Sequence, residues 1–103
     1  MNSASIITLV KNLIATPSFS REEEATATLI QNFLKGEGVE TQRSGNNIWS
    51  IHPDFEEGRP TLLLNSHHDT VKPNKSYTRD PFDPAVDTGR LYGLGSNDAG
   101  GPL

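Results

Sequence analysis

The chain has 103 residues and a net charge of −4, a size that fits one domain with one core. Hydrophobic residues make up 33% of it, so that core is lean. No basic run is present, which argues against a nucleic-acid partner, since phosphate binding needs clustered Lys and Arg. The absence of cysteine excludes disulfides and thiolate metal sites. We find no secretory signal and no apolar run near the roughly 20 residues that cross a bilayer, so we expect a cytoplasmic protein without a membrane partner.

Two amphipathic helices are predicted in the first third of the chain. Apolar residues recur three and four apart over residues 6–14, and a Thr-Pro pair then ends the first helix. A second apolar stripe covers residues 25–34 and stops at Gly36. Ser20 and Glu23 have the spacing of a capping box, which predicts that the second helix begins at Ser20.

Strands are predicted after the second helix. Residues 39–43 and 48–52 flank turn-forming residues and predict a hairpin. Residues 61–65 form an apolar run of strand length, which is typical of a strand covered on both faces. Residues 90–92 suggest one further short strand. This order predicts an α/β fold in which helices are layered on a sheet.

Polar residues with metal-ligand chemistry follow the predicted buried strand. His67 and Asp69 are two apart, so in an extended segment their side chains point to the same side. A neutral imidazole is a good zinc ligand, and a carboxylate is a common partner for its other nitrogen. Ligands usually bind at the carboxyl edge of such sheets. Short motifs also match by accident, and a polar strand end that bonds its own loop is the alternative interpretation.

A second candidate carboxylate, Asp98, lies in the glycine-rich segment 93–101. Glycines allow tight turns and a close approach of the backbone to an ion or substrate. A carboxylate can bridge two metal ions, because it has two oxygens. The alternative is a glycine-rich loop in which Asp98 is an ordinary helix N-cap.

Taken together, these segments resemble the co-catalytic zinc family of deacetylases, aminoacylases and carboxypeptidases, and most closely its acetylornithine deacetylase branch. The resemblance spans nearly the whole chain. It rests on the ordered set His67-x-Asp69-Thr70-Val71, Asp80-Pro81-Phe82, Gly89 to Gly95 and Asp98. It implies a zinc-peptidase-like αβα catalytic domain, of which residues 1–103 would be the N-terminal portion, with the rest of that domain and a lid or dimerisation domain absent.

The resemblance also implies roles for individual residues. His67 would bind one zinc ion, Asp98 would bridge two zinc ions, and Asp69 would act in catalysis as the partner of His67; cobalt is a possible substitute for zinc. A cis peptide bond is implied after Asp98. Gly100 stands where many relatives carry lysine, so any role of that lysine is absent or taken by another residue.

The function implied is a zinc-dependent hydrolase that removes an N-acyl group from an amino acid, with arginine biosynthesis as the expected setting. The general base and remaining ligands would lie beyond residue 103, so we expect the chain alone to be inactive. The alternatives are a dipeptidase or aminoacylase, or a non-catalytic fragment that self-associates; a homodimer is a further possibility. His68 is expected to pack or hydrogen-bond near the site and not to bind metal.

Overall fold

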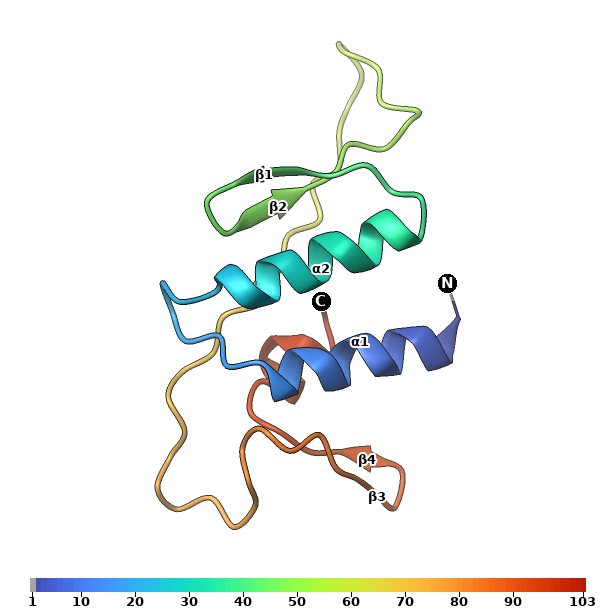
Figure 1. Cartoon of the computed structure of the whole chain (residues 1–103). Helices are drawn as coiled ribbons and strands as arrows, with labels where there is room; N and C mark the ends of the chain where they lie inside the picture. The colour runs from blue at the N-terminus through green and yellow to red at the C-terminus, as the bar shows by residue number, and fades with distance from the viewer. Residues whose placement is uncertain (1) are drawn as a thin grey trace.

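A computed structural model describes residues 2–103 of the chain. Helices α1 (Ser3–Ala15) and α2 (Glu24–Gly36) lie side by side (Figure 1). A hairpin of β1 (Gln42–Ser44) and β2 (Asn47–Trp49) lies along α2. The chain then forms a second hairpin of β3 (Val86–Asp87) and β4 (Arg90–Leu91), followed by a single wide helical turn, η1 (Ser96–Gly100). This combination of helices and small strands is consistent with the predicted α/β class.

Helix α1 begins and ends where its local sequence favours it. Asn2 and Ser5 form a capping box, in which the Ser5 amide donates to Asn2 Oδ1 over 2.9 Å. The helix stops at Ala15 because Pro17 pushes Thr16 into extended backbone. Ile14 is buried at the end of the apolar stripe. The first predicted helix is therefore confirmed.

Helix α2 begins at Glu24, so the prediction that Ser20 caps it is wrong. The backbone at Arg21 has φ of +73°, which interrupts the helical geometry that a capping box requires. The Glu23 carboxylate instead accepts a hydrogen bond from the Arg21 amide at 2.8 Å, and no side chain caps the helix. Gly36 ends the helix as predicted.

The predicted hairpin is confirmed, with shorter strands. Ser44 pairs with Asn47 across a two-residue turn, in which Gly45 has φ of +60°. A positive φ is the conformation that hairpin turns of this length need. The predicted strand near residue 90 is also confirmed as β4, which pairs with β3 through Asp87 and Arg90.

The prediction of a buried strand at residues 61–65 is wrong. No strand forms there, and Leu62, Leu63 and Leu64 are 83–85% exposed. A strand requires a neighbouring backbone to pair with. Within residues 2–103 the only sheets are the two hairpins, and neither pairs with this segment.

The open arrangement leaves a large surface and a small core. The accessible area is 7825 Å² for 11.2 kDa, whereas a compact monomer of this mass exposes about 5,700 Å². Among the described residues, only Ile14, Ala27 and Leu94 are buried hydrophobic residues. Ile14 and Leu94 line a small pocket together with His67 and His68. No helix in this part of the chain is both long and apolar enough to cross a membrane.

Candidate metal centre

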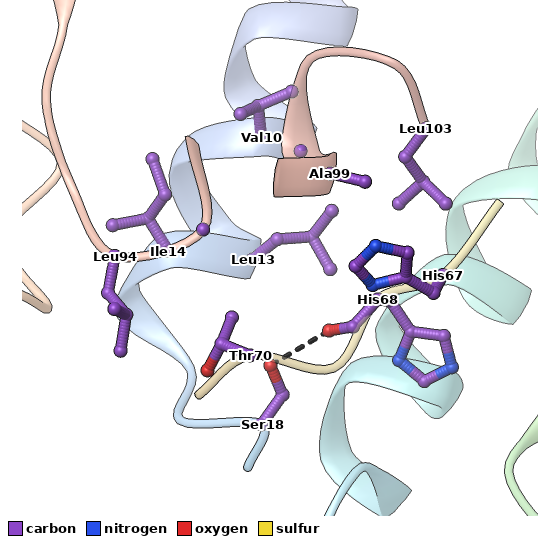
Figure 2. A pocket seen from close by; sticks show the side chains of 12 residues that line it. Val10, Leu13, Ile14, Ser18, His67, His68, Thr70, Leu94, Ala99 and Leu103 are labelled. Carbon is purple, nitrogen blue, oxygen red and sulfur yellow. Dashed lines mark hydrogen bonds between the residues drawn. The ribbon is translucent and has the colours of Figure 1, made fainter. Parts of the chain in front are cut away.

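The segment that carries the two histidines is fastened to the loop after α1. The Thr70 amide donates to the Ser18 carbonyl at 2.8 Å, and Phe19 and Thr70 form a parallel bridge. The buried Ser18 hydroxyl donates to the His68 carbonyl at 2.9 Å (Figure 2). These three contacts fix residues 67–70 as an extended strip at the end of α1. Alternation along this strip sends His67 and His68 in different directions.

The structure brings all three sequence-predicted site residues together. His67 Nε2 lies 2.9 Å from Asp98 Oδ1, although the two residues are 31 positions apart. The other ring nitrogen, Nδ1, lies 3.0 Å from Asp69 Oδ1. The imidazole of His67 is therefore held between two carboxylates. The position of Asp69 is the one expected of a group that orients the ring.

Asp98 reaches His67 because glycines let its loop pack closely. A Cβ on Gly93 would lie 2.2 Å from Ile14 Cγ2, and one on Gly95 would lie 2.6 Å from Thr70 Cγ2. Both glycines also have positive φ, at 146° and 78°. Any larger side chain would push the loop away from α1 and from the histidine strip.

The turn that contains Asp98 differs from an ordinary helix start. Gly95, not Asp98, occupies the N-cap of η1, so the alternative of an N-cap aspartate is not observed. The Asp98-Ala99 peptide bond is cis, as the family resemblance implied. A Cβ on Gly100 would lie 2.9 Å from the Gly95 carbonyl oxygen, so lysine at this position would require the backbone to shift.

The two carboxylates make the site favourable for positive charge. Desolvation is the largest single effect on the pKa of His67 and lowers it, but hydrogen bonds and charges from Asp69 and Asp98 together outweigh it and raise that pKa above its ordinary value. The pKa of Asp69 is lowered, mainly by the hydrogen bond from the Ser20 hydroxyl and also by the charge of His67. Because the two carboxylates favour a proton on the His67 ring, they would also favour a metal cation in place of that proton.

The donor set fits a divalent metal but is incomplete. Two ligands on one tetrahedral zinc lie roughly 3.3 Å apart if each bond is about 2.0–2.1 Å. His67 Nε2 and Asp98 Oδ1, at 2.9 Å, are already close to that separation. No group of three or more His, Cys, Asp or Glu side chains suited to a metal occurs within residues 2–103. The side chains of His67 and Asp98 are 51% and 86% exposed, so further ligands can approach them.

An open groove of about 520 Å³ runs beside this pair of residues. Its walls come from the His67 strip, the loop around Arg79 and the glycine-rich segment. The Arg79 guanidinium lies 3.8 Å above the ring of Tyr92 and bonds Asp87, which braces the loop. A small molecule could therefore reach the His67–Asp98 pair from solvent.

His68 has a structural role, as expected. Its Nδ1 lies 2.8 Å from the hydroxyl of the fully buried Thr26, and its Nε2 lies 3.0 Å from the Asn46 carbonyl oxygen. His68 thus links the strip to α2 and to the first hairpin. The residue that sequence analysis missed is Ser20, whose hydroxyl donates to Asp69 Oδ2 over 2.5 Å. Because Ser20 and Asp69 are 49 positions apart, no local sequence pattern indicates their contact.

The structure is a mixed α/β chain in which one histidine is held between two carboxylates beside an open groove. No family model matches the sequence. Curated relatives do match: it is 34% identical over 106 residues to the succinyl-diaminopimelate desuccinylase of Stenotrophomonas maltophilia strain R551-3, covering 97% of this chain and 28% of that protein. It is 38% identical over 109 residues to the acetylornithine deacetylase of Edwardsiella ictaluri, covering 94% and 28%.

A more distant match points to the same group. The chain is 31% identical over 94 residues to the succinyl-diaminopimelate desuccinylase of Nautilia profundicola, covering 90% of this chain and 26% of that protein. The chain therefore belongs to the family of these desuccinylases and deacetylases. It spans about 28% of the length of the first relatives.

Proposed function

We propose that the chain is part of a metal-dependent amide hydrolase that removes an N-acyl group from an amino acid. One observation carries this proposal: the His67 ring is held between Asp69 and Asp98, at 3.0 and 2.9 Å, on the edge of an open groove. The names of the relatives support the reaction class, since desuccinylases and deacetylases both release an acyl group.

Each of the three residues has a proposed role. His67 and Asp98 would hold zinc, with cobalt as a substitute, and Asp98 has a second oxygen available to bridge to a second ion. Asp69 would keep Nδ1 of His67 protonated and so leave Nε2 free for the metal. When bound, a metal ion of this type lowers the pKa of a water molecule and polarises the amide carbonyl.

The proposal includes the wider architecture. Residues 1–103 would form the N-terminal portion of a layered zinc-peptidase-like catalytic domain, and the general base and remaining ligands would come from other parts of a longer protein. A lid domain and a homodimer would belong to that longer protein. A cytoplasmic biosynthetic enzyme is the setting we propose.

N-acetyl-ornithine is our proposed substrate, in arginine biosynthesis. Support comes from the Gly-Leu-Gly sequence before Asp98 and from the 38% identity to an acetylornithine deacetylase. Two of the three relatives named above are succinyl-diaminopimelate desuccinylases, so N-succinyl-diaminopimelate is a competing candidate, and dipeptides and other acyl amino acids are the runners-up. Assaying the full-length protein on all four substrate types, with zinc present, separates these candidates.

The test of the metal site is a calorimetric zinc titration of the 103-residue chain, with His67→Ala as the control. Sub-micromolar binding that the substitution abolishes would support a preorganised pair of ligands. Weak binding that is unaffected by the substitution would contradict the proposed role of His67 in this chain. The full-length protein gives the corresponding test with all ligands present.

A second candidate function is self-association without catalysis. The observation that favours it is the excess exposed surface, which includes the three exposed leucines of segment 61–65. Light scattering of the chain over a range of concentrations tests this candidate. A strictly monomeric chain would argue against it.

A further inference from the structure

The Ser20 hydroxyl is the outermost member of a chain of hydrogen bonds that runs from Ser20 through Asp69 to His67. It donates to Asp69 Oδ2 at 2.5 Å, while Asp69 Oδ1 lies 3.0 Å from His67 Nδ1. The two oxygens of one carboxylate thus have different partners, a hydroxyl on one side and an imidazole on the other. A carboxylate held at both oxygens cannot rotate freely, so the direction in which it presents Oδ1 is fixed.

Backbone contacts place Ser20 beside Asp69. Phe19, which precedes Ser20, forms a parallel β-bridge with Thr70, which follows Asp69. The Thr70 amide also bonds the Ser18 carbonyl at 2.8 Å. The contact between Ser20 and Asp69 therefore belongs to a paired segment and does not depend on one side-chain conformer alone.

Ser20 has no competing task at the helix that follows. The positive φ of Arg21 separates Ser20 from α2, which begins at Glu24. The Glu23 carboxylate, which a capping box would direct back to Ser20, bonds the Arg21 amide at 2.8 Å and the Asn46 side chain at 3.0 Å. Within residues 2–103, the Ser20 side chain hydrogen-bonds the Asp69 carboxylate alone.

We propose that Ser20 is a positioning residue for the metal site: through Asp69 it fixes the ring of His67 that would bind zinc. This inference rests on the proposed function. Ser20 would touch neither metal nor substrate, and its effect would pass entirely through the carboxylate. Removing the carboxylate that bonds a metal-binding histidine typically changes metal affinity by about 10- to 100-fold, so the loss of Ser20, one step further out, should lie at the lower end of that range.

The experiment measures zinc affinity of the full-length protein by competition with a chelator, without substrate. Ser20→Ala should lower the affinity by about tenfold, whereas Ser20→Thr keeps a hydroxyl and should stay close to the unaltered protein. Ser50→Ala is the matched control, because the Ser50 hydroxyl bonds the Glu40 carbonyl at 2.8 Å and touches none of His67, Asp69 and Asp98. It should leave zinc affinity nearly unchanged.

A double substitution tests the route through the carboxylate. In an Asp69→Ala background, Ser20→Ala should have no further effect on zinc affinity. Equal affinities of Ser20→Ala and the unaltered protein, or an undiminished loss in the Asp69→Ala background, would overturn the inference while leaving the proposed function standing. An unaltered protein that binds no zinc would overturn both. Circular dichroism of each variant separates loss of folding from loss of positioning.

Discussion

Two neighbouring segments, residues 61–65 and 67–70, behave in opposite ways. The first is more apolar, yet its three leucines are 83–85% exposed and it pairs with no strand. The second is polar, yet it is fixed by backbone bonds to the loop after α1 and by hydrogen bonds from both of its histidines. The comparison teaches that specific hydrogen-bond partners, and not hydrophobicity, order the segment around His67.

The ordered segment, residues 67–70, is held by close contacts near one end of α1. The Ser18 hydroxyl bonds the His68 carbonyl, and the His68 ring bonds Thr26 of α2. Asp98 approaches His67 from the glycine-rich turn. The exposed segment would need a neighbouring strand, and none lies beside it within residues 2–103. Substitutions in the two segments should therefore have effects of very different size.

The largest effect is expected from Asp98→Ala, which removes the carboxylate that faces His67 Nε2. Loss of a direct ligand should reduce zinc affinity and hydrolysis in the full-length protein by more than the 10- to 100-fold that is typical of an outer partner. Chelator competition and initial rates measure the two quantities. Asp54→Ala, which removes a 91% exposed carboxylate in the loop after β2, is the control. Retention of full zinc affinity in Asp98→Ala would contradict the proposed ligand pair.

The next largest effect is expected from a substitution at Gly93, where the glycine-rich turn packs against α1. In Gly93→Ala the new Cβ would lie 2.2 Å from Ile14 Cγ2 at a φ of +146°, so α1 and the glycine-rich turn must separate. Overpacking and backbone strain together should cost about 2–4 kcal/mol of the free energy of unfolding. Gly58→Ala is the matched control, because it has positive φ and open space around it. Urea denaturation of both variants measures the difference, and equal losses would show that close packing at Gly93 is unimportant.

The features that sequence analysis predicted well are those that depend on local sequence. Helix α1, the end of α2 at Gly36 and the first hairpin follow from apolar spacing, a proline and a turn. Their signals lie within a few residues of the structure they determine. The proximity of His67 and Asp98 was predicted from the order of the family motifs, and not from the spacing of the two residues along the chain.

The incorrect predictions depend on contacts between distant residues. The capping-box pattern at Ser20 assumes helical backbone, but Arg21 has positive φ and Ser20 pairs with Asp69, 49 positions away. The apolar run at residues 61–65 has the composition of a buried strand, but burial requires surrounding elements that residues 2–103 do not provide. In both cases the residue types were informative, and their partners could not be identified from local spacing.

A small effect is expected in the exposed segment. Leu63→Lys should change the free energy of unfolding of the 103-residue chain by less than about 0.5 kcal/mol, because the side chain is 83% exposed. The same substitution should reduce any self-association seen by light scattering, since it places charge in the exposed leucine strip. Leu94→Lys is the contrasting control, because Leu94 is buried beside the site, and it should destabilise the chain strongly. A large loss of stability in Leu63→Lys would remove the distinction between the two segments.

A further small effect is the pH dependence of the metal-free chain. The pKa of His67 is raised above 6.5, so the stability that its protonated ring contributes is fully present below pH 6.5 and is lost as pH rises through the raised value. The pKa of Asp69 is lowered below 3.8, so its contribution is present above pH 3.8 and is lost as pH falls through the lowered value. The side chains of His67 and Asp69 are 51% and 33% exposed, so solvent screening should keep each effect below about 1 kcal/mol.

Zinc affinity should follow the opposite trend above pH 5. Because a metal ion must replace the proton on His67 Nε2, affinity should rise with pH until the raised pKa of His67 is passed. Denaturation and zinc titrations at pH 5 and pH 8 measure both trends, and His67→Gln should remove the contribution of this ring from each. If stability and zinc affinity rose together with pH, and did so equally in His67→Gln, the proton and the metal would not share one position. The ordered segment would then be a structural strip, and His67 would no more belong to a metal site than its neighbour His68 does.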